Sequence, residues 1–156
     1  MSLSREFIAE EKLVEKVLRV FCDGGARGNP GPAAVGFVVK DNKGRTLVKI
    51  GKYIGKTTNN VAEYQGVIEA LKWLKKNFPI SQFPNVQLNF LLDSKLIVNQ
   101  LNGLYKIKNT RLRNLIVKVR ILEREIKLPI NYHYISRGKN KEADSLVNQV
   151  LNRHLD

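Results

Sequence analysis

Residues 18–34 read LRVFCDGGARGNPGPAA, and this stretch determines the fold that we expect. Its first part, 18–23, is an apolar and β-prone run of the kind that forms a buried central strand. The glycines, asparagine and prolines that follow predict a turn over 26–32, which leads into a second strand over 34–40. We therefore expect Asp23 at the end of a buried strand, where a carboxylate needs a compensating partner.

The sequence on the C-terminal side predicts first more sheet and then β-to-α units. A hairpin turn at 41–44 connects the second strand to a third over 46–53, which completes an antiparallel meander. A helix follows up to residue 78, with Thr58 or Asn59 as its cap and Pro79 after its end. The remaining pattern predicts a strand over 86–92, a short helix over 94–101, a basic amphipathic helix over 110–127, a strand over 130–135, a loop over 137–140 and a helix over 142–155.

The length of 156 residues and the hydrophobic content of 43% fit one domain with one core. Residues 4–18 show a rough helical stripe, so we separate an N-terminal leader or packing helix, 1–17, from the domain, 18–156. Cys22 is the only cysteine, which excludes an intrachain disulfide and favours a reducing compartment, the cytoplasm. No signal peptide or membrane-spanning stretch is evident, so we expect no membrane partner.

The chain is strongly basic. It holds 27 Lys and Arg against 14 Asp and Glu, a formal net charge of +13. A positive field of this size favours a polyanionic partner such as nucleic acid, although solubility alone is the alternative interpretation.

Four of the scarce acids fall at junctions between predicted elements: Asp23, Glu63, Asp93 and Asp144. Like charges that lie close together resist ionisation unless a cation neutralises them, and oxygen ligands select a hard ion such as Mg²⁺ or Mn²⁺. A pair of such ions would serve phosphodiester hydrolysis. The alternative is that Glu63 and Asp144 only favour the helix starts through the macrodipole.

At these acids the chain resembles the type 1 ribonuclease H family, over residues 18–152. The resemblance rests on four ordered motifs: FCDGGARGNPGP over 21–32, TNNVAEY over 58–64, LDS over 92–94 and NKEAD over 140–144. It implies an α/β fold, the ribonuclease H-like fold, in which a five-stranded mixed sheet is flanked by helices. That sheet combines the three-strand meander with two parallel strands.

The resemblance also implies a function, which is endonucleolytic cleavage of the RNA strand of an RNA–DNA hybrid with two Mg²⁺ ions, for which Mn²⁺ substitutes. Asp23 would bridge the two ions, Glu63 and Asp93 would hold the ion on the leaving-group side, and Asp144 the ion that activates water. The products would carry 5′-phosphate and 3′-hydroxyl ends, and the protein would be a monomer.

Residues beside the acids are candidates for binding the hybrid. The backbone amides of Gly24, Gly25 and Arg27 are expected to approach a sugar-phosphate strand, because glycines remove side-chain obstruction. Four further residues offer polar groups to the minor groove, where 2′-hydroxyls distinguish RNA: Asn29, Thr58, Asn59 and Asn60. A turn role for Asn29 and cap roles for Thr58 and Asn59 are equally compatible with the sequence.

The chain departs from the family's bacterial pattern in two places. The loop before Asp144 has no histidine, and we assign Arg137 as its stand-in, since a cation there still attracts phosphate. The basic handle after Asp93 is missing, so binding of the DNA strand would depend on other cations, some of which are alternatively a solvated helix face: Lys106, Lys108, Arg111, Arg113, Lys118 and Arg120. Trp73 is expected at the edge of the core, and His133 is expected to pack within its strand.

Two other functions remain open. One is a non-catalytic nucleic-acid-binding domain that keeps the same shape, although four acids without metal would repel a phosphate backbone. The other is a related nuclease, such as a junction resolvase or integrase core, for which the acid pattern usually differs.

Overall fold

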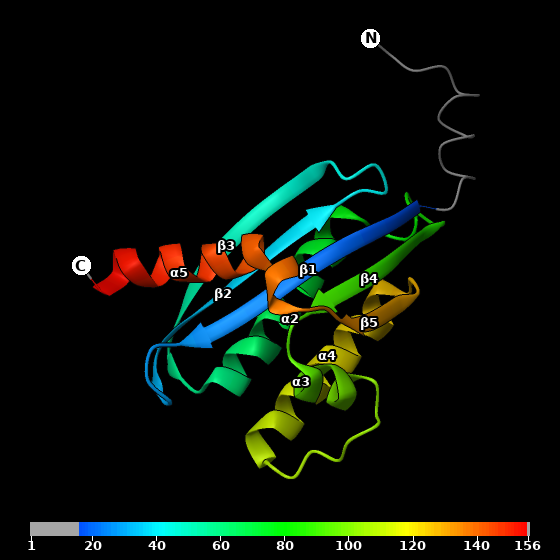
Figure 1. Ribbon diagram of the computed structural model, residues 1–156. Helices are drawn as coiled ribbons and strands as arrows, with labels where there is room; N and C mark the ends of the chain where they lie inside the picture. Colours follow the sequence, from blue (N-terminus) through cyan, green and yellow to red (C-terminus); the bar gives the residue numbers. More distant parts are fainter. Residues whose placement is uncertain (1–15, 156) are drawn as a thin grey trace.

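The computed structural model describes residues 16–155, so most of the helical stripe predicted over 4–18 lies outside the described residues, and its last residues, 16–18, belong to a strand instead. The chain forms a five-stranded sheet with helices on both faces (Figure 1). Its elements are β1 (Lys16–Ala26), β2 (Gly31–Lys40), β3 (Thr46–Thr57), α2 (Asn59–Asn77), β4 (Val86–Leu92), α3 (Lys95–Leu101), α4 (Thr110–Ile126), β5 (Ile130–Tyr134), the 3₁₀ turn η1 (Arg137–Lys139) and α5 (Lys141–Leu155).

The strand order is β3-β2-β1-β4-β5. β1 to β3 form an antiparallel meander, while β4 pairs in parallel with both β1 and β5. This sheet confirms the predicted mixed architecture. It also makes β1 the central strand, as its apolar sequence indicates.

The central strand differs from the prediction at both ends. It begins at Lys16, two residues before the expected domain start, and it continues beyond Asp23 because 24–26 pair with β2. The parallel pairing with β4, however, stops at Phe21 and Leu91. Asp23 is therefore not at the end of its strand, but it lies just beyond the point where β1 and β4 separate.

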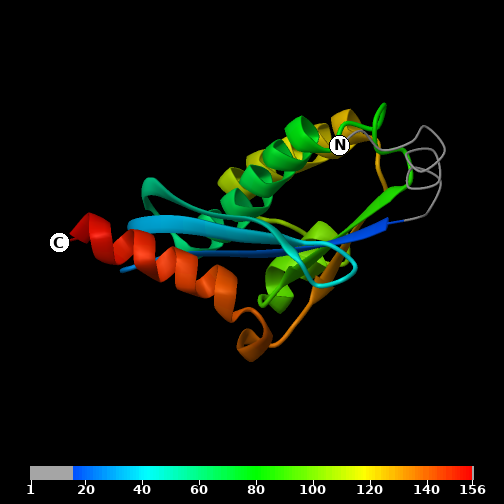
Figure 2. The ribbon, with the colours of Figure 1, turned by 90° about the horizontal axis from the view of Figure 1, so that it is seen from above.

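Helices cover the two faces of the sheet unequally. α2 packs on β1 with α4 beside it, and α5 packs on β2 and β3 across the other face (Figure 2). The larger core lies between the sheet and α2, where the fully buried side chains include Val20, Phe37, Tyr64 and Leu71. The acids at the starts of α2 and α5 thus reach the sheet from opposite faces.

Glycines allow both helices to approach the sheet closely. A Cβ on Gly24 would lie 2.1 Å from the carbonyl oxygen of Ala62 in α2, and one on Gly66 would lie 2.8 Å from that of Asp23. On the opposite face, a Cβ on Gly36 would lie 2.6 Å from the carbonyl oxygen of Ala143. Only a residue without a side chain fits such backbone contacts. Ala62 and Ala143 each directly precede one of the acids, so these contacts bring the acids to the sheet.

Polar side chains cap two helices near the acids: α2, which carries Glu63, and α3, which follows Asp93. The Thr58 hydroxyl accepts a hydrogen bond from the N–H of Val61 at 3.3 Å, which confirms Thr58 as the cap of α2. Ser94 caps α3 in the same way through the N–H of Ile97, at 3.3 Å. These caps fix where each helix begins and hence where Glu63 and Asp93 stand.

The structure changes two minor predictions and confirms another. The segment expected as a loop over 137–140 contains the turn η1. Trp73 is half-buried at the core edge, as predicted, with its ring centroid 6.4 Å from that of Phe37. The packing role for His133 is wrong, because Tyr132 next to it faces the core and the alternation of β5 leaves His133 exposed.

None of the helices within residues 16–155 combines the length and apolar character that crossing a membrane requires.

The contact at Gly24 predicts a large effect of one methyl group. Gly24→Ala should lower the free energy of unfolding by at least about 2 kcal/mol, because the new Cβ collides with backbone that cannot rotate away. Urea denaturation measures this difference. Gly138→Ala is the matched control, since a Cβ there meets nothing within 4 Å. Equal stability of the two variants would contradict the close contact between β1 and α2.

Candidate active site

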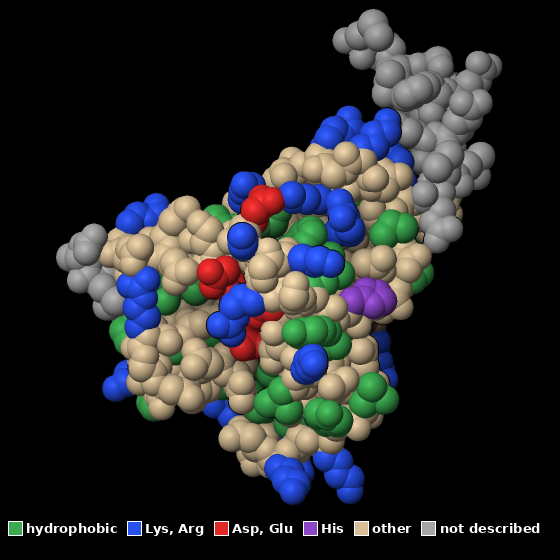
Figure 3. Space-filling model, viewed as in Figure 1, with side chains coloured by type: hydrophobic (Ala, Val, Ile, Leu, Met, Phe, Trp, Pro, Cys, Tyr) green, Lys and Arg blue, Asp and Glu red, His purple; other side chains and the backbone are tan. Residues whose placement is uncertain are grey.

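The four predicted carboxylates line one pocket of about 350 Å³. Asp23 comes from β1, Glu63 from the N-terminal part of α2 and Asp144 from the first turn of α5, and Asp93 directly follows β4. Figure 3 shows acidic side chains in the middle of this face, between α5 and α3, with Lys and Arg around them. The fold therefore gathers acids that are up to 121 residues apart in the sequence.

The pocket lies where the sheet opens. In open α/β sheets, ligands collect beyond the carboxyl ends of parallel strands. β4 ends at Leu92, and beyond its pairing with β1 the two strands diverge around Asp23 and Asp93. The N-terminal parts of α2 and α5, which lie on opposite faces of the sheet, close the pocket from the sides.

The environment of Asp23 disfavours its charge. Burial and then the charge of Asp93 raise the pKa of Asp23 to about 8. Smaller contributions to this pKa come from Asp144 and Glu63, which raise it, and from a hydrogen bond donated by the N–H of Gly24, which lowers it. A carboxyl group whose pKa is raised by burial and by neighbouring acids is typical of a functional site.

Glu63 is held in a similar environment. Burial raises its pKa to about 7, and Asp93 contributes to the rise. The Ser94 hydroxyl and the charge of Arg137 act in the opposite direction. Two neighbouring acids thus favour protonation near neutral pH unless positive charge enters the pocket.

A divalent cation fits this donor set. Among residues 16–155, no group of three or more acid, histidine or cysteine side chains is already arranged to hold a metal ion. All four nevertheless line one pocket and offer oxygen only, which suits Mg²⁺ or Mn²⁺ far better than a softer metal.

The glycine loop serves the fold in places where we expected it to serve the substrate. The missing side chain of Gly24 makes room for α2, and the N–H of Arg27 donates to the carbonyl of Pro32 at 2.8 Å. The backbone amide of Arg27 is therefore not available to a phosphate, contrary to the prediction. Gly24, Gly25 and Arg27 all line the pocket, and the Arg27 guanidinium donates to Asn152 of α5 at 2.6 Å.

The predicted minor-groove residues connect the glycine loop to α2. The Asn29 side chain accepts a hydrogen bond from the N–H of Asn59 at 3.0 Å, and the Asn59 side chain accepts one from the N–H of Ala26 at 2.8 Å. Asn59 lines the pocket, whereas Asn29, Thr58 and Asn60 lie outside its lining. The turn role for Asn29 and the cap role for Thr58 are thus both present.

Arg137 is the residue that we assigned as the stand-in for the missing loop histidine. It lies in η1, lines the pocket and is close enough to Glu63 to lower the pKa of that acid. No histidine is among the described residues that line the pocket. Arg137 thus brings positive charge to the pocket of the acids.

Two asparagines at the site were missed by the sequence analysis. Asn148 donates to the Asp144 carboxylate at 3.3 Å, one turn further along α5. Asn140 donates to the Asp93 carboxylate at 3.2 Å and is almost completely buried. The spacing of Asn148 from Asp144 was a usable signal, since residues four apart on a helix are neighbours. The contact between Asn140 and Asp93 is long-range and left no such signal.

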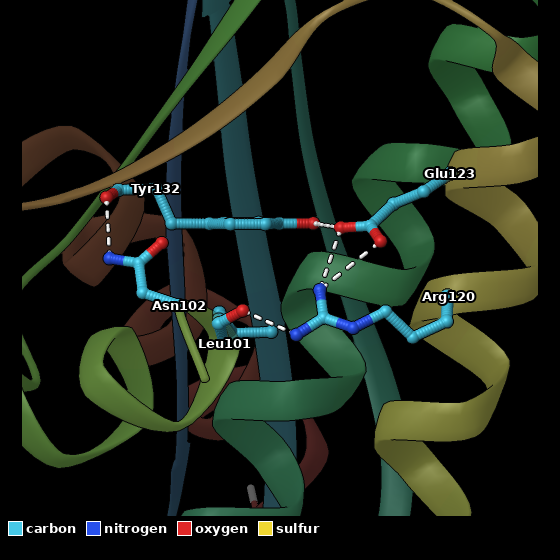
Figure 4. Close-up of polar contacts among 5 residues, drawn as sticks. All are labelled: Leu101, Asn102, Arg120, Glu123 and Tyr132. Carbon is cyan, nitrogen blue, oxygen red and sulfur yellow. Dashed lines mark hydrogen bonds and ion pairs between the residues drawn. The ribbon is translucent and has the colours of Figure 1, made fainter. Parts of the chain in front are cut away.

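Arg120 is not part of a free basic surface. Its guanidinium donates to both oxygens of Glu123, at 3.1 and 3.0 Å, and to the carbonyl of Leu101 (Figure 4). The Tyr132 hydroxyl donates to the same carboxylate at 2.6 Å, so this group joins α4 to α3 and β5. The other five cations of that predicted surface are exposed. Arg120 is thus removed from the candidates for DNA contact.

Comparison with known proteins agrees with this fold. A family model described as reverse transcriptase-like matches residues 21–150. Ribonuclease HI of Halobacterium salinarum is 33% identical over 137 residues, which cover 86% of this chain and 64% of that protein. The chain belongs to the type 1 ribonuclease H family.

Solved structures of this family superpose closely on the chain. A ribonuclease H1 isolated from compost, solved in complex with an RNA/DNA hybrid, is 39% identical with a TM-score of 0.83, over 91% of this chain and 100% of that one. The structure of ribonuclease H1 from Halobacterium salinarum gives 32% identity and a TM-score of 0.80, over 88% and 98%.

A longer relative matches only in part. A bifunctional protein of Mycobacterium tuberculosis is 39% identical over 130 residues, which cover 83% of this chain. The chain spans only 34% of that protein's length.

The electrostatics of the pocket predict a stabilising substitution. Without divalent ions, Asp23→Asn should raise the free energy of unfolding near neutral pH by on the order of 1–3 kcal/mol, because it removes a charge that the folded state disfavours. For the same reason, this carboxyl group should make the wild type lose stability as the pH rises from 3.8 to about 8, the interval in which the folded state binds the extra proton.

Denaturation in EDTA across that interval measures both effects. Asp41→Asn is the control of opposite sign, because Asp41 accepts hydrogen bonds from the N–H groups of Lys43 and Arg45 and pairs with Arg45. An Asp23→Asn variant that is less stable than the wild type would contradict the repulsion in the pocket.

Proposed function

We propose that this chain hydrolyses the RNA strand of RNA–DNA hybrids endonucleolytically. The observation that carries the proposal is the convergence of four carboxylates on one pocket in a chain with a net charge of +13. A basic surface attracts a nucleic acid, and an acidic pocket within it attracts the cations that phosphodiester hydrolysis needs. The family assignment and the hybrid in the related compost enzyme support the same substrate.

Each carboxylate has a separate role in the proposal. The four acids would hold two Mg²⁺ ions, Glu63 and Asp93 on the leaving-group side, Asp144 on the side of the attacking water and Asp23 between the two. Ions bound there would supply neutralisation of charge at the scissile phosphate and activation of water, and Mn²⁺ would substitute for Mg²⁺. Asp23 suits the position between the two ions because it lies on the central strand and its pKa is raised by the charges of all three other acids. The products carry 5′-phosphate and 3′-hydroxyl ends.

Residues around the acids orient the hybrid. Glu63 and Asn59 line the pocket from the start of α2, where they face the 2′-hydroxyl that distinguishes RNA from DNA. Arg137 contacts the phosphate next to the scissile bond, and Gly25 leaves space for the strand. Asn29 and Thr58 hold the glycine loop and α2 in place through their hydrogen bonds, and Asn60 offers its polar side chain to the minor groove.

The proposal includes a monomer that acts in the cytoplasm, as the reduced and buried Cys22 suggests. The two competing functions make different predictions for cleavage. A binding domain would retain the hybrid without cutting it, while a resolvase would cut branched DNA and leave the hybrid intact.

The substrate assay separates these functions. The protein should cleave end-labelled RNA in a hybrid with Mg²⁺ or Mn²⁺, but not in EDTA, and should leave duplex DNA and branched DNA uncut. Asp93→Asn should reduce this activity by at least about 100-fold, because it removes a charged oxygen ligand from the pocket.

Glu125→Gln provides the matched control, since Glu125 pairs with Lys75 on the surface of α4, away from the pocket. It should keep wild-type activity. Tight binding of the hybrid without cleavage under either metal would overturn the proposal in favour of a binding domain.

A further inference from the structure

Asn140 occupies a position between the elements that carry the acids. It follows η1 and directly precedes α5, and its side chain is buried, with 1% of the residue exposed. An asparagine is seldom buried so completely unless its amide is hydrogen-bonded. Its hydrogen bonds therefore indicate what it does.

The side-chain amide joins two strands at the point where they separate. The Nδ2 group donates to the carbonyl oxygen of Cys22 at 2.9 Å and to the carboxylate of Asp93 at 3.2 Å. Cys22 directly precedes Asp23 on β1, and Asp93 directly follows β4. One NH₂ group thus links Asp93 to the residue that precedes Asp23, where β1 and β4 separate.

The backbone of Asn140 connects the same point to α5 and to η1. Its carbonyl oxygen accepts the N–H of Asp144 at 3.1 Å, and its N–H donates to the carbonyl of Arg137 at 3.0 Å. A single residue is therefore bonded directly to Asp93 and Asp144 and to the residue before Asp23.

The orientation of the amide follows from its partners. Both groups that face Nδ2 are oxygens, so a flipped amide would set its own oxygen against a carbonyl and a carboxylate. The Oδ1 atom, which is also buried, accepts no hydrogen bond from residues 16–155. Asn140 consequently acts on this site through its donor.

We propose that Asn140 is a positioning residue that sets the spacing of Asp23, Asp93 and Asp144 for divalent metal binding, an inference that rests on the proposed function. The carboxylates repel one another, so a neutral donor that holds one of them lowers the work of bringing them around an ion. A lysine in this place would itself neutralise Asp93 and compete with the ion. An amide holds the carboxylate and leaves its charge for the metal.

The inference is tested with Asn140→Leu and Asn140→Ala. Leucine keeps most of the buried volume and removes the donor, whereas alanine removes both, so the pair separates packing from hydrogen bonding. Gln100→Leu is the matched control, because Gln100 is also a buried amide but accepts its hydrogen bond from Tyr64, at 2.7 Å. Thermal denaturation identifies the temperature range in which every variant is folded.

The first readout is Mn²⁺ binding without substrate, followed by electron paramagnetic resonance. Both Asn140 variants should bind Mn²⁺ about 10-fold more weakly than the wild type, while Gln100→Leu should bind it normally. The second readout is hybrid cleavage, in which kcat should fall by about 10- to 100-fold and the KM for the hybrid should change little. Raising the metal concentration should restore part of the lost activity, which it would not do for a purely structural defect.

Wild-type Mn²⁺ affinity in Asn140→Leu, or recovery of the affinity by leucine but not by alanine, would overturn the inference. Failure of both variants to fold would also overturn it, since the residue would then act on the whole fold. If the wild type cleaves no hybrid but the Asn140 variants still bind Mn²⁺ weakly, the proposed function fails while the positioning role stands.

Discussion

The contact between Gly24 and the backbone of Ala62 constrains the rest of the active site. No side chain separates β1 from α2 there, so the first turn of α2 lies directly against the central strand. Glu63 follows Ala62 and is therefore held beside the part of β1 that carries Asp23. A corresponding contact between Gly36 and Ala143 places Asp144 from the other face. The pocket is thus a consequence of how closely two helices can approach one sheet.

This arrangement lowers the stability of the folded chain when no cation is bound. Burial and neighbouring acids raise the pKa of Asp23 to about 8 and that of Glu63 to about 7, so the folded chain without metal holds charges that it disfavours. The net charge of +13 moderates this cost at long range and attracts a polyanion. An ion that enters the pocket relieves the repulsion, and this links metal binding to the shape of the site.

Polar residues of similar appearance in the sequence have different roles in the fold. Arg120 looks like one more cation on a basic helix, but it is bound to Glu123 and to the end of α3. The amide of Arg27 looks available for a phosphate, but it is bound within the turn. Asn140 looks like a loop residue, but it reaches two strands. In each case the partner is a backbone or side-chain group whose position local sequence patterns do not encode.

The sequence by itself determined the order of strands and helices along the chain, the family and the four candidate acids, and it narrowed the cap of α2 to Thr58 or Asn59. These follow from local periodicity, turn chemistry and motif spacing, which depend on residues close together in the chain. Only the tertiary structure decided that Gly24 serves helix packing, that β1 continues past Asp23, and that Asn140 joins the acids. Those facts depend on contacts between distant segments, whose distances are set by the packing of the sheet against its helices.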